Sequence, residues 1–132
     1  IYYDSSEHKF KYMNNTAGWK PLSGSGNVQS GWGYVCNVAG CPVVSISGID
    51  YPSRTVNFTT SFSTPPKVVA IQTGCKSSTA PSSPADCNAL ICSGNQLANA
   101  PMITDVTTTG FTFINYVYVA GQYVGFYWIA SE

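Results

Sequence analysis

The closing stretch of the chain, residues 104–131, constrains the fold more than any other segment. It holds two runs rich in aromatic and β-branched side chains, residues 110–119 and 123–130. Such side chains pack well on the pleated surface of a sheet and less well on a helix. Residues 120–122 between the runs include Gly121, and a short break containing glycine favours a turn. The two runs are therefore predicted to form an antiparallel hairpin.

Side chains in each run alternate between two faces of the predicted strand. In the first run, one face carries Phe111, Phe113, Asn115, Val117 and Val119, and the other carries Thr112, Ile114, Tyr116 and Tyr118. In the second run, Val124, Phe126, Trp128 and Ala130 alternate with Tyr123, Gly125, Tyr127 and Ile129. Because both faces hold large apolar groups, the hairpin is predicted to lie centrally in a sheet, with other parts of the chain covering each side.

Shorter strand candidates precede the closing stretch, at residues 33–36, 41–47, 53–60, 67–72, 89–92 and 101–104. Residues 73–86 between them are rich in Gly, Ser and Pro, and are predicted to form a surface loop. No segment shows the apolar periodicity and capping residues of a helix. Roughly seven short strands separated by turn residues predict an all-β fold, an antiparallel β-sandwich of about six to seven strands.

The first 22 residues differ in composition from the rest, since they carry five of the twelve charged side chains. Residues 1–3 and 10–13 are strand candidates around a polar turn. We predict a small β-hairpin appendage at residues 1–22, a Gly/Ser linker at 23–27 and the sandwich at 28–132. The alternative is that residues 1–22 provide the first strands of the sandwich.

The low charge of the chain argues against several functions. Charged residues make up 9% of it and the net charge is zero, so there is no basic face for nucleic acid. No apolar run approaches the length of about eighteen residues that suggests a membrane span. Asp50, Asp86 and Asp105 are isolated, and the only histidine, His8, lies in the N-terminal segment. We therefore expect no enzyme activity, no metal site, no cofactor and no membrane insertion.

The five cysteines favour disulfides in a secreted or surface protein. Their spacing lacks the paired C-x-x-C of zinc sites. Cys36 with Cys41 would close a short loop between strands. Cys75 would close the Ser/Pro-rich loop by pairing with Cys87 or with Cys92. In the first case Cys92 is left over, either free or bonded to another chain. The sequence begins without a leader, and we expect it to be part of a longer chain.

Three segments in order resemble the H-type lectin domain. They are residues 27–31, residues 56–71, and residues 106–111 together with 127–130. That family has a "V-x-S-G" start, an "F-x-x-P-P-x-V" strand and a "V-x-x-x-G-F … W-x-A" ending. The resemblance covers residues 28–132. It implies a sandwich of about six or seven antiparallel strands, assembly as a trimer, and sugar binding, often of N-acetylgalactosamine, near the boundaries between subunits.

The sugar-contacting positions of that family match this chain only in part. The aromatic platform corresponds to Tyr118, with Val119 where the family has a histidine. The acidic position falls at Gly33 or Tyr34, and Arg54 lies away from the position of the family's arginine. The resemblance therefore implies candidate ligand-binding residues around the platform: Tyr118, Tyr116, Asn115, Tyr34 and Gln122. The alternative is that the aromatic residues lie in the core or in a subunit interface.

The N-terminal segment resembles short β modules that precede the receptor-binding tips of phage tail fibres and that occur in type IV pilus minor pilins. Together the resemblances imply an extracellular homotrimer at the tip of a pilus or a phage-tail-like filament, binding a glycan or surface receptor. The missing charged partners predict weak affinity per site, which three copies would strengthen. The alternative function is a trimerisation module that binds no sugar, docks another filament protein, and caps or initiates the filament.

Overall fold

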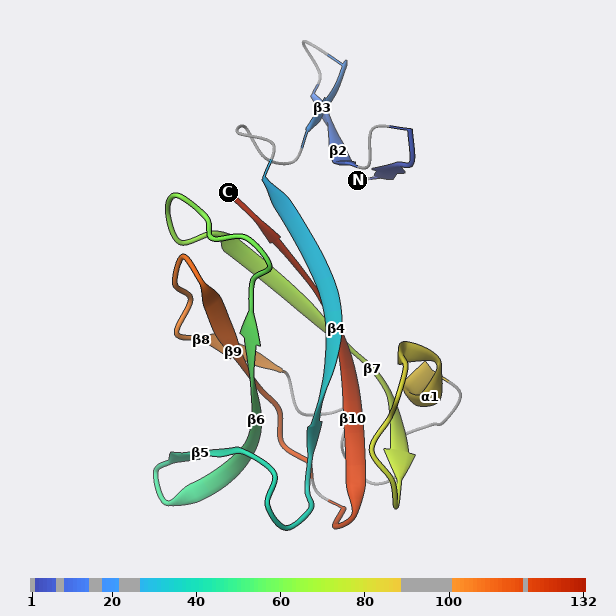
Figure 1. Cartoon of the computed structure of the whole chain (residues 1–132), viewed down its shortest axis with the longest axis vertical. Helices are drawn as coiled ribbons and strands as arrows, with labels where there is room; N and C mark the ends of the chain where they lie inside the picture. Colours follow the sequence, from blue (N-terminus) through green and yellow to red (C-terminus); the bar gives the residue numbers. More distant parts are fainter. Residues whose placement is uncertain (1, 7–8, 15–17, 22–26, 89–100, 118) are drawn as a thin grey trace.

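The computed structural model describes residues 2–6, 9–14, 18–21, 27–88, 101–117 and 119–132. Within these ranges, two antiparallel sheets pack against each other as a β-sandwich, and a small third sheet precedes them (Figure 1). The predicted fold class, an all-β antiparallel sandwich, is confirmed. Neighbouring strands pair antiparallel throughout the described part of the chain.

The first sheet of the sandwich has the order β4-β10-β7 in the described ranges. Its strands are β4 (Val28–Cys36), β10 (Gln122–Ser131) and β7 (Lys67–Ser77). The second sheet has the order β5-β6-β9-β8, made of β5 (Val43–Ile46), β6 (Ile49–Asn57), β9 (Gly110–Ile114) and β8 (Met102–Thr104). The central position of β10, between β4 and β7, agrees with the prediction that the closing stretch lies inside a sheet.

The predicted hairpin between the two closing runs is wrong, because β9 and β10 belong to different sheets. Strand β9 pairs with β6 and β8, and β10 pairs with β4 and β7. The described residues between these strands, 115–117 and 119–121, therefore lead from one sheet to the other. Side-chain alternation identifies which face of a strand is buried, but it does not identify the neighbouring strand. The same alternation is expected for two neighbouring strands of one sheet and for two strands that face each other from different sheets.

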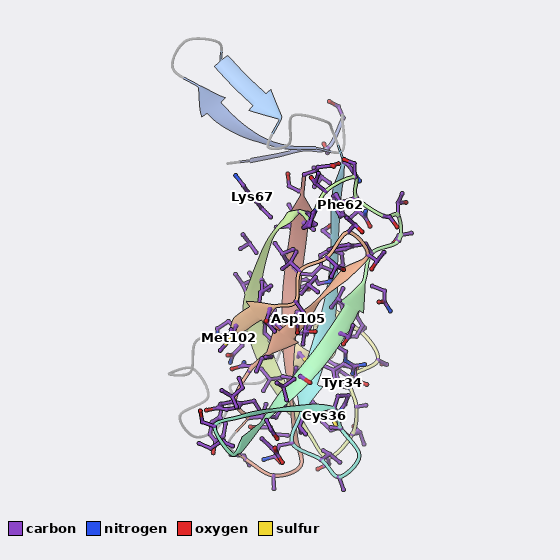
Figure 2. The ribbon with its side chains drawn as sticks, turned by 90° about the vertical axis from the view of Figure 1, so that its left-hand side faces the viewer. Tyr34, Cys36, Phe62, Lys67, Met102 and Asp105 are labelled. Carbon is purple, nitrogen blue, oxygen red and sulfur yellow. A yellow bond between two sulfur atoms is a disulfide. The ribbon has the colours of Figure 1, made fainter. Side chains whose placement is uncertain are left out.

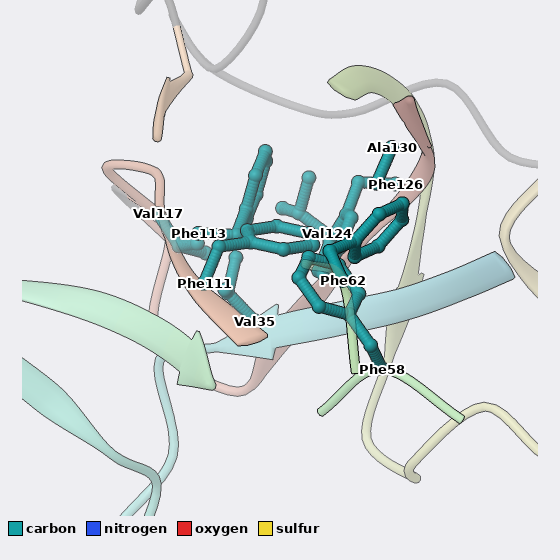
Figure 3. Close-up of a cluster of buried hydrophobic side chains, with 9 residues drawn as sticks. All are labelled: Val35, Phe58, Phe62, Phe111, Phe113, Val117, Val124, Phe126 and Ala130. Carbon is teal, nitrogen blue, oxygen red and sulfur yellow. The ribbon is translucent and has the colours of Figure 1, made fainter. Parts of the chain in front are cut away.

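The side chains that the alternation grouped on one face of each strand nevertheless lie together in the core. Phe111, Phe113 and Val117 are buried on the β9 side, and Val124, Phe126 and Ala130 are buried on the β10 side. Phe58 and Phe62, from the segment after β6, complete the cluster together with Val35 (Figure 3). The ring of Trp128 packs at 5.5 Å from Phe111 and 5.8 Å from Phe58, centroid to centroid. One aromatic core therefore holds the two sheets together.

Two glycines of β4 make room for the large rings of β10. Gly33 is the register partner of Phe126, and Gly31 is the partner of Trp128. A Cβ atom at Gly33 would lie 2.8 Å from the Phe126 ring, and one at Gly31 would lie 2.9 Å from the Trp128 indole. The rings therefore occupy the space that side chains at these positions of β4 would otherwise fill.

The predicted loop at residues 73–86 is partly wrong. Strand β7 continues through Ser77, and a short helix, α1 (Pro84–Asn88), begins near the end of the predicted loop. A helix of five residues spans less than two turns, so it leaves no apolar periodicity to detect. Buried Cys87 in α1 lies over Gly125 of β10, so α1 covers part of the outer face of the first sheet. The predicted strand at 89–92 lies outside the described residues, whereas β8 confirms the one at 101–104.

The N-terminal segment forms a sheet of order β1-β2-β3 in its described parts. These strands are β1 (Tyr2–Asp4), β2 (Lys9–Asn14) and β3 (Gly18–Pro21). The predicted hairpin of β1 and β2 is present, and β3 adds a strand that the sequence did not predict. Within the described ranges these strands pair with one another and not with the sandwich. The division of the chain at residues 22 and 27 stays a prediction.

Candidate functional site

A polar cleft of about 330 Å³ lies at one end of the sandwich. Its walls come from the end of β4, from the β5-β6 hairpin and from the segment that crosses between the sheets. The lining residues are Cys36, Asn37, Val38, Val43, Asp50, Pro52, Tyr116 and Val117. Figure 1 shows β5, the start of β6 and the start of β10 gathered at this end of the molecule.

A disulfide between Cys36 and Cys41 closes the loop beside the cleft, with the Cα atoms 6.0 Å apart. This is the pairing predicted from the sequence. In Figure 2, Cys36 is labelled at the end of β4. Because the bond joins the end of β4 to the residues that lead into β5, it limits the movement of the chain that carries Asn37 and Val38.

Asn37 connects the cleft wall to the crossing segment through three hydrogen bonds. Its side-chain Nδ2 donates to the Val117 carbonyl at 2.9 Å. Its backbone N–H donates to the Gln122 carbonyl at 3.0 Å, and its own carbonyl accepts from the Gly121 N–H at 2.8 Å. These contacts hold the crossing segment, and with it Tyr116, against the end of β4.

Asp50 brings a carboxylate to the rim of the cleft. One of its oxygens, Oδ1, accepts a short hydrogen bond from the Ser45 hydroxyl across the β5-β6 hairpin. The other oxygen, Oδ2, has no partner among the residues that the structure describes, and the side chain is exposed. A carboxylate oxygen with this exposure can accept hydrogen bonds from a ligand.

Tyr116 supplies an aromatic ring to the same cleft. The ring is half-buried and packs edge-on against Tyr51 of β6, with centroids 5.8 Å apart and planes at 64°. Edge-to-face packing of this kind restricts the orientation of an aromatic side chain. The cleft therefore combines a fixed ring, a carboxylate and an amide, which are groups that orient small polar ligands in proteins.

The other predicted site residues lie in different environments. Asn115 and Gln122 are buried, at 2% and 3% exposure. Asn115 donates from Nδ2 to Gln72 Oε1 at 2.9 Å and from its backbone to the Pro52 carbonyl at 3.1 Å. Tyr118 lies outside the described residues. Tyr34 lines a separate pocket between β4 and β6. The structure thus places Tyr116 in the cleft and Asn115 next to it in the chain, and the binding role of all five stays a prediction.

Sequence reasoning missed Asn37 and Asp50. In the sequence Asp50 is an isolated carboxylate, because no second acidic residue is near it in the chain. Asn37 carries one local signal, its position directly after a disulfide cysteine. Neither residue belongs to a motif, and the cleft exists only because β4, β6 and the crossing segment end close together.

An apolar groove of about 480 Å³ lies on the outer face of the β4-β10-β7 sheet. Val69 and Ile71 of β7 are each 60% exposed there, and Tyr127 of β10 is 37% exposed. Tyr127 pairs with Ile71 on one side and with Trp32 of β4 on the other, so the apolar side chains continue across all three strands. A continuous exposed apolar surface of this kind usually marks an interaction site. The predicted cover of the sheet is therefore present at α1 and absent here, as far as the described residues show.

Two classes of site are not found in the described part of the chain. No group of three or more His, Cys, Asp and Glu side chains there could hold a metal ion. No helix among the described residues is long and apolar enough to cross a membrane. Comparison with known proteins finds no family model that matches the chain and no curated protein that matches it.

Proposed function

We propose that this domain is an adhesion domain that binds a glycan on a surface receptor through the cleft formed by Asn37, Asp50 and Tyr116. The observation that carries the proposal is the convergence of a ring, a carboxylate and an amide in one solvent-open cleft. The resemblance to H-type lectins supports the same ligand class. The Cys36–Cys41 disulfide is typical of extracellular proteins, which supports a place at the tip of a pilus or phage-tail-like filament.

In this proposal each cleft residue has a separate task. The free Oδ2 of Asp50 accepts hydrogen bonds from sugar hydroxyls, and the Asn37 amide adds a further polar contact. The Tyr116 ring packs against the C–H face of the sugar. The bonds from Ser45 to Asp50 and from Asn37 to Val117 fix these groups before the ligand arrives, which lowers the entropy lost on binding.

The apolar groove supports assembly into a homotrimer. Val69, Ile71 and Tyr127 would leave water when subunits associate, and that burial favours association. Three clefts on one particle would bind a multivalent surface more tightly than one cleft does. Weak binding by a single cleft is therefore compatible with adhesion.

The groove also favours a second candidate function, a trimerisation and docking module that caps or initiates a filament and binds no sugar. The two functions differ in which surface must work. Glycan binding requires the polar cleft, whereas docking requires only the apolar groove.

A glycan array probed with the full chain tests the proposal, followed by titration of any glycan that binds. We expect Asp50→Asn and Tyr116→Ala each to weaken binding by about tenfold or more, and Tyr118→Ala to weaken it as well. Asp105→Asn is the matched control, because Asp105 is an exposed acid outside the cleft. Absence of any glycan hit from a well-folded trimer would overturn the proposal in favour of the docking module.

A further inference from the structure

A further pocket lies in the seam between the two sheets, where the edge strand β4 passes β6. It has a volume of about 260 Å³ and is lined by Trp32, Gly33, Tyr34, Arg54, Thr55 and Val56. Figure 1 shows β4 and β6 running side by side, and Figure 2 labels Tyr34 on β4. This pocket shares no lining residue with the cleft at Tyr116.

Arg54, the only arginine of the chain, is held in this pocket by two contacts with Tyr34. Its Nε donates to the Tyr34 carbonyl at 3.0 Å. Its guanidinium carbon lies 4.3 Å from the centre of the Tyr34 ring. The Tyr34 ring is itself packed edge-on against Tyr123, with centroids 5.6 Å apart. The guanidinium is therefore fixed in position and orientation before any ligand binds.

The terminal nitrogens of the Arg54 guanidinium make no hydrogen bond within the described part of the protein. Its two terminal amines, Nη1 and Nη2, have no hydrogen-bond acceptor among the described residues, and no carboxylate there forms an ion pair with Arg54. These nitrogens are not buried, since the buried side-chain atom without a partner in the described ranges is Asn115 Oδ1. The two terminal amino groups of the fixed, positively charged guanidinium therefore face solvent in a pocket whose aromatic walls are Trp32 and Tyr34.

A guanidinium with two free terminal amino groups favours a carboxylate as its ligand. Two parallel N–H donors match the two oxygens of a carboxylate, and bonds between charged partners are about twice as strong as neutral ones. Half-burial strengthens the attraction, because the effective dielectric constant beside the protein is lower than that of water. Trp32 adds an aromatic wall, and the exposed Thr55 adds a hydroxyl.

We infer that this pocket binds the carboxylate of an acidic sugar residue, so that the domain prefers glycans that carry uronic-type acids over their neutral equivalents. The inference rests on the proposed function, because it assumes that the ligand is a glycan. Nη1 and Nη2 of Arg54 hold the two carboxylate oxygens, and the ring of the sugar packs against Trp32.

The test uses the full chain and two probes that differ at one carbon, methyl β-D-glucuronide and methyl β-D-glucoside. Binding is measured by the shift of the Trp32 indole N–H signal in NMR spectra, at low and at high salt. We expect the glucuronide to bind about tenfold tighter than the glucoside, as one charge-assisted pair provides. The difference should shrink as salt rises.

Two variants locate the effect. Arg54→Gln removes the charge and should abolish the preference for the glucuronide. Arg54→Lys keeps the charge without the paired donors and should retain only part of it. Lys67→Gln is the matched control, since it removes an exposed positive charge elsewhere on the first sheet. Thermal melting curves verify that each variant is folded, and the salt dependence of the unmodified chain needs no variant at all.

The outcomes separate this inference from the proposed function. Equal binding of the two probes, or an unchanged preference in folded Arg54→Gln, would overturn the inference. If N-acetylglutamate bound as tightly as the glucuronide, the part of the inference that requires a sugar ring on Trp32 would be overturned. Glycan binding that depends on Asp50 and Tyr116 but shows no preference for the glucuronide would support the proposed function and overturn this inference. Binding of the glucuronide that depends on Arg54 and not on Asp50 would mean that the cleft is not the binding site and that this pocket is.

Discussion

Phe113 of β9 and Phe126 of β10 stack between the two sheets, with ring centroids 3.9 Å apart and planes only 17° from parallel. Both side chains are almost completely buried. The two residues come from different sheets, so their contact helps to fix how the sheets sit on each other. It also explains why two adjacent runs of the sequence share one core without pairing as a hairpin.

Loss of either ring should strongly destabilise the fold. Phe126→Ala removes a buried aromatic side chain and leaves a cavity, and such changes cost about 3–5 kcal/mol of unfolding free energy. Urea denaturation followed by tryptophan fluorescence measures the loss. Ile49→Ala is the control, because Ile49 is 50% exposed and lies outside both the apolar groove and the cleft, and its effect should be below about 1 kcal/mol. Similar losses for the two variants would contradict the placement of Phe126.

Gly110 should tolerate no side chain. A Cβ atom there would press directly against the Val56 carbonyl oxygen of the neighbouring strand, and the backbone would have to move. Gly110→Ala is expected to reduce the unfolding free energy by about 1–3 kcal/mol. Its register partner Asn57 is exposed, so Asn57→Ala should change stability by less than about 0.5 kcal/mol. A fully stable Gly110→Ala protein would mean that β6 and β9 are not paired in this register.

The Cys36–Cys41 disulfide should stabilise the native state modestly. The bond closes a loop with a sequence separation of 5 residues, and the chain-entropy model assigns about 2 kcal/mol to a loop of that size. Cys41→Ser should therefore lower the unfolding free energy by about that amount, and dithiothreitol should lower it more in the unmodified protein than in the variant, which has already lost this bond. An equal effect of dithiothreitol on both proteins would point to another bond as its cause.

A second disulfide involving Cys75 is expected from the sequence. Cys75 is the register partner of Val124 on β10, and Cys87 lies over the next residue, Gly125. Mass spectrometry of a digest made without reductant should contain a peptide that links Cys75 to Cys87 or to Cys92. Finding Cys75 only as a thiol in protein prepared under oxidising conditions would show the prediction to be wrong.

Trimer formation should depend on the apolar groove. Ile71→Asp places a charge on an exposed apolar position of β7 and should weaken association by at least about a hundredfold, because a charge buried in an interface without a partner costs several kcal/mol. Light scattering at micromolar concentration measures the mass. Met102→Asp, which changes another exposed apolar residue, on β8 and outside the groove, should leave the mass unchanged. A monomer mass for the unmodified chain would show the trimer prediction to be wrong.

The sequence predicted which side chains share a face of a strand better than it predicted which strands are neighbours. Alternation grouped Phe111 with Phe113 and Val124 with Phe126, because it depends only on local geometry. The path of residues 115–121 depends on long-range bonds, such as the one from the Asn115 N–H to the Pro52 carbonyl. No local pattern records such a bond, so the sheet exchange was missed.

The candidate site was predictable only in its aromatic component. Tyr116 was a candidate because the resemblance to H-type lectins places an aromatic platform at the neighbouring Tyr118. Asn37 and Asp50 are polar residues in unremarkable surroundings, and their roles come from three chain segments that meet in space. The sequence alone could not tell that Arg54 reaches the ring of Tyr34, since the two residues are on strands of different sheets.

The register of β4 and β10 determines how the cleft is presented. Val28 pairs with Ser131, and the Glu132 N–H donates to the Asn27 carbonyl, so the chain enters and leaves the sandwich at the same end (Figure 1). Cys36 pairs with Tyr123 at the opposite end, beside the cleft. The nine residues of β4 separate these ends by about 30 Å. An anchor attached at the terminal end would therefore point the cleft outward, and in the proposed adhesion the tension from a bound surface would act along the length of β4 and β10.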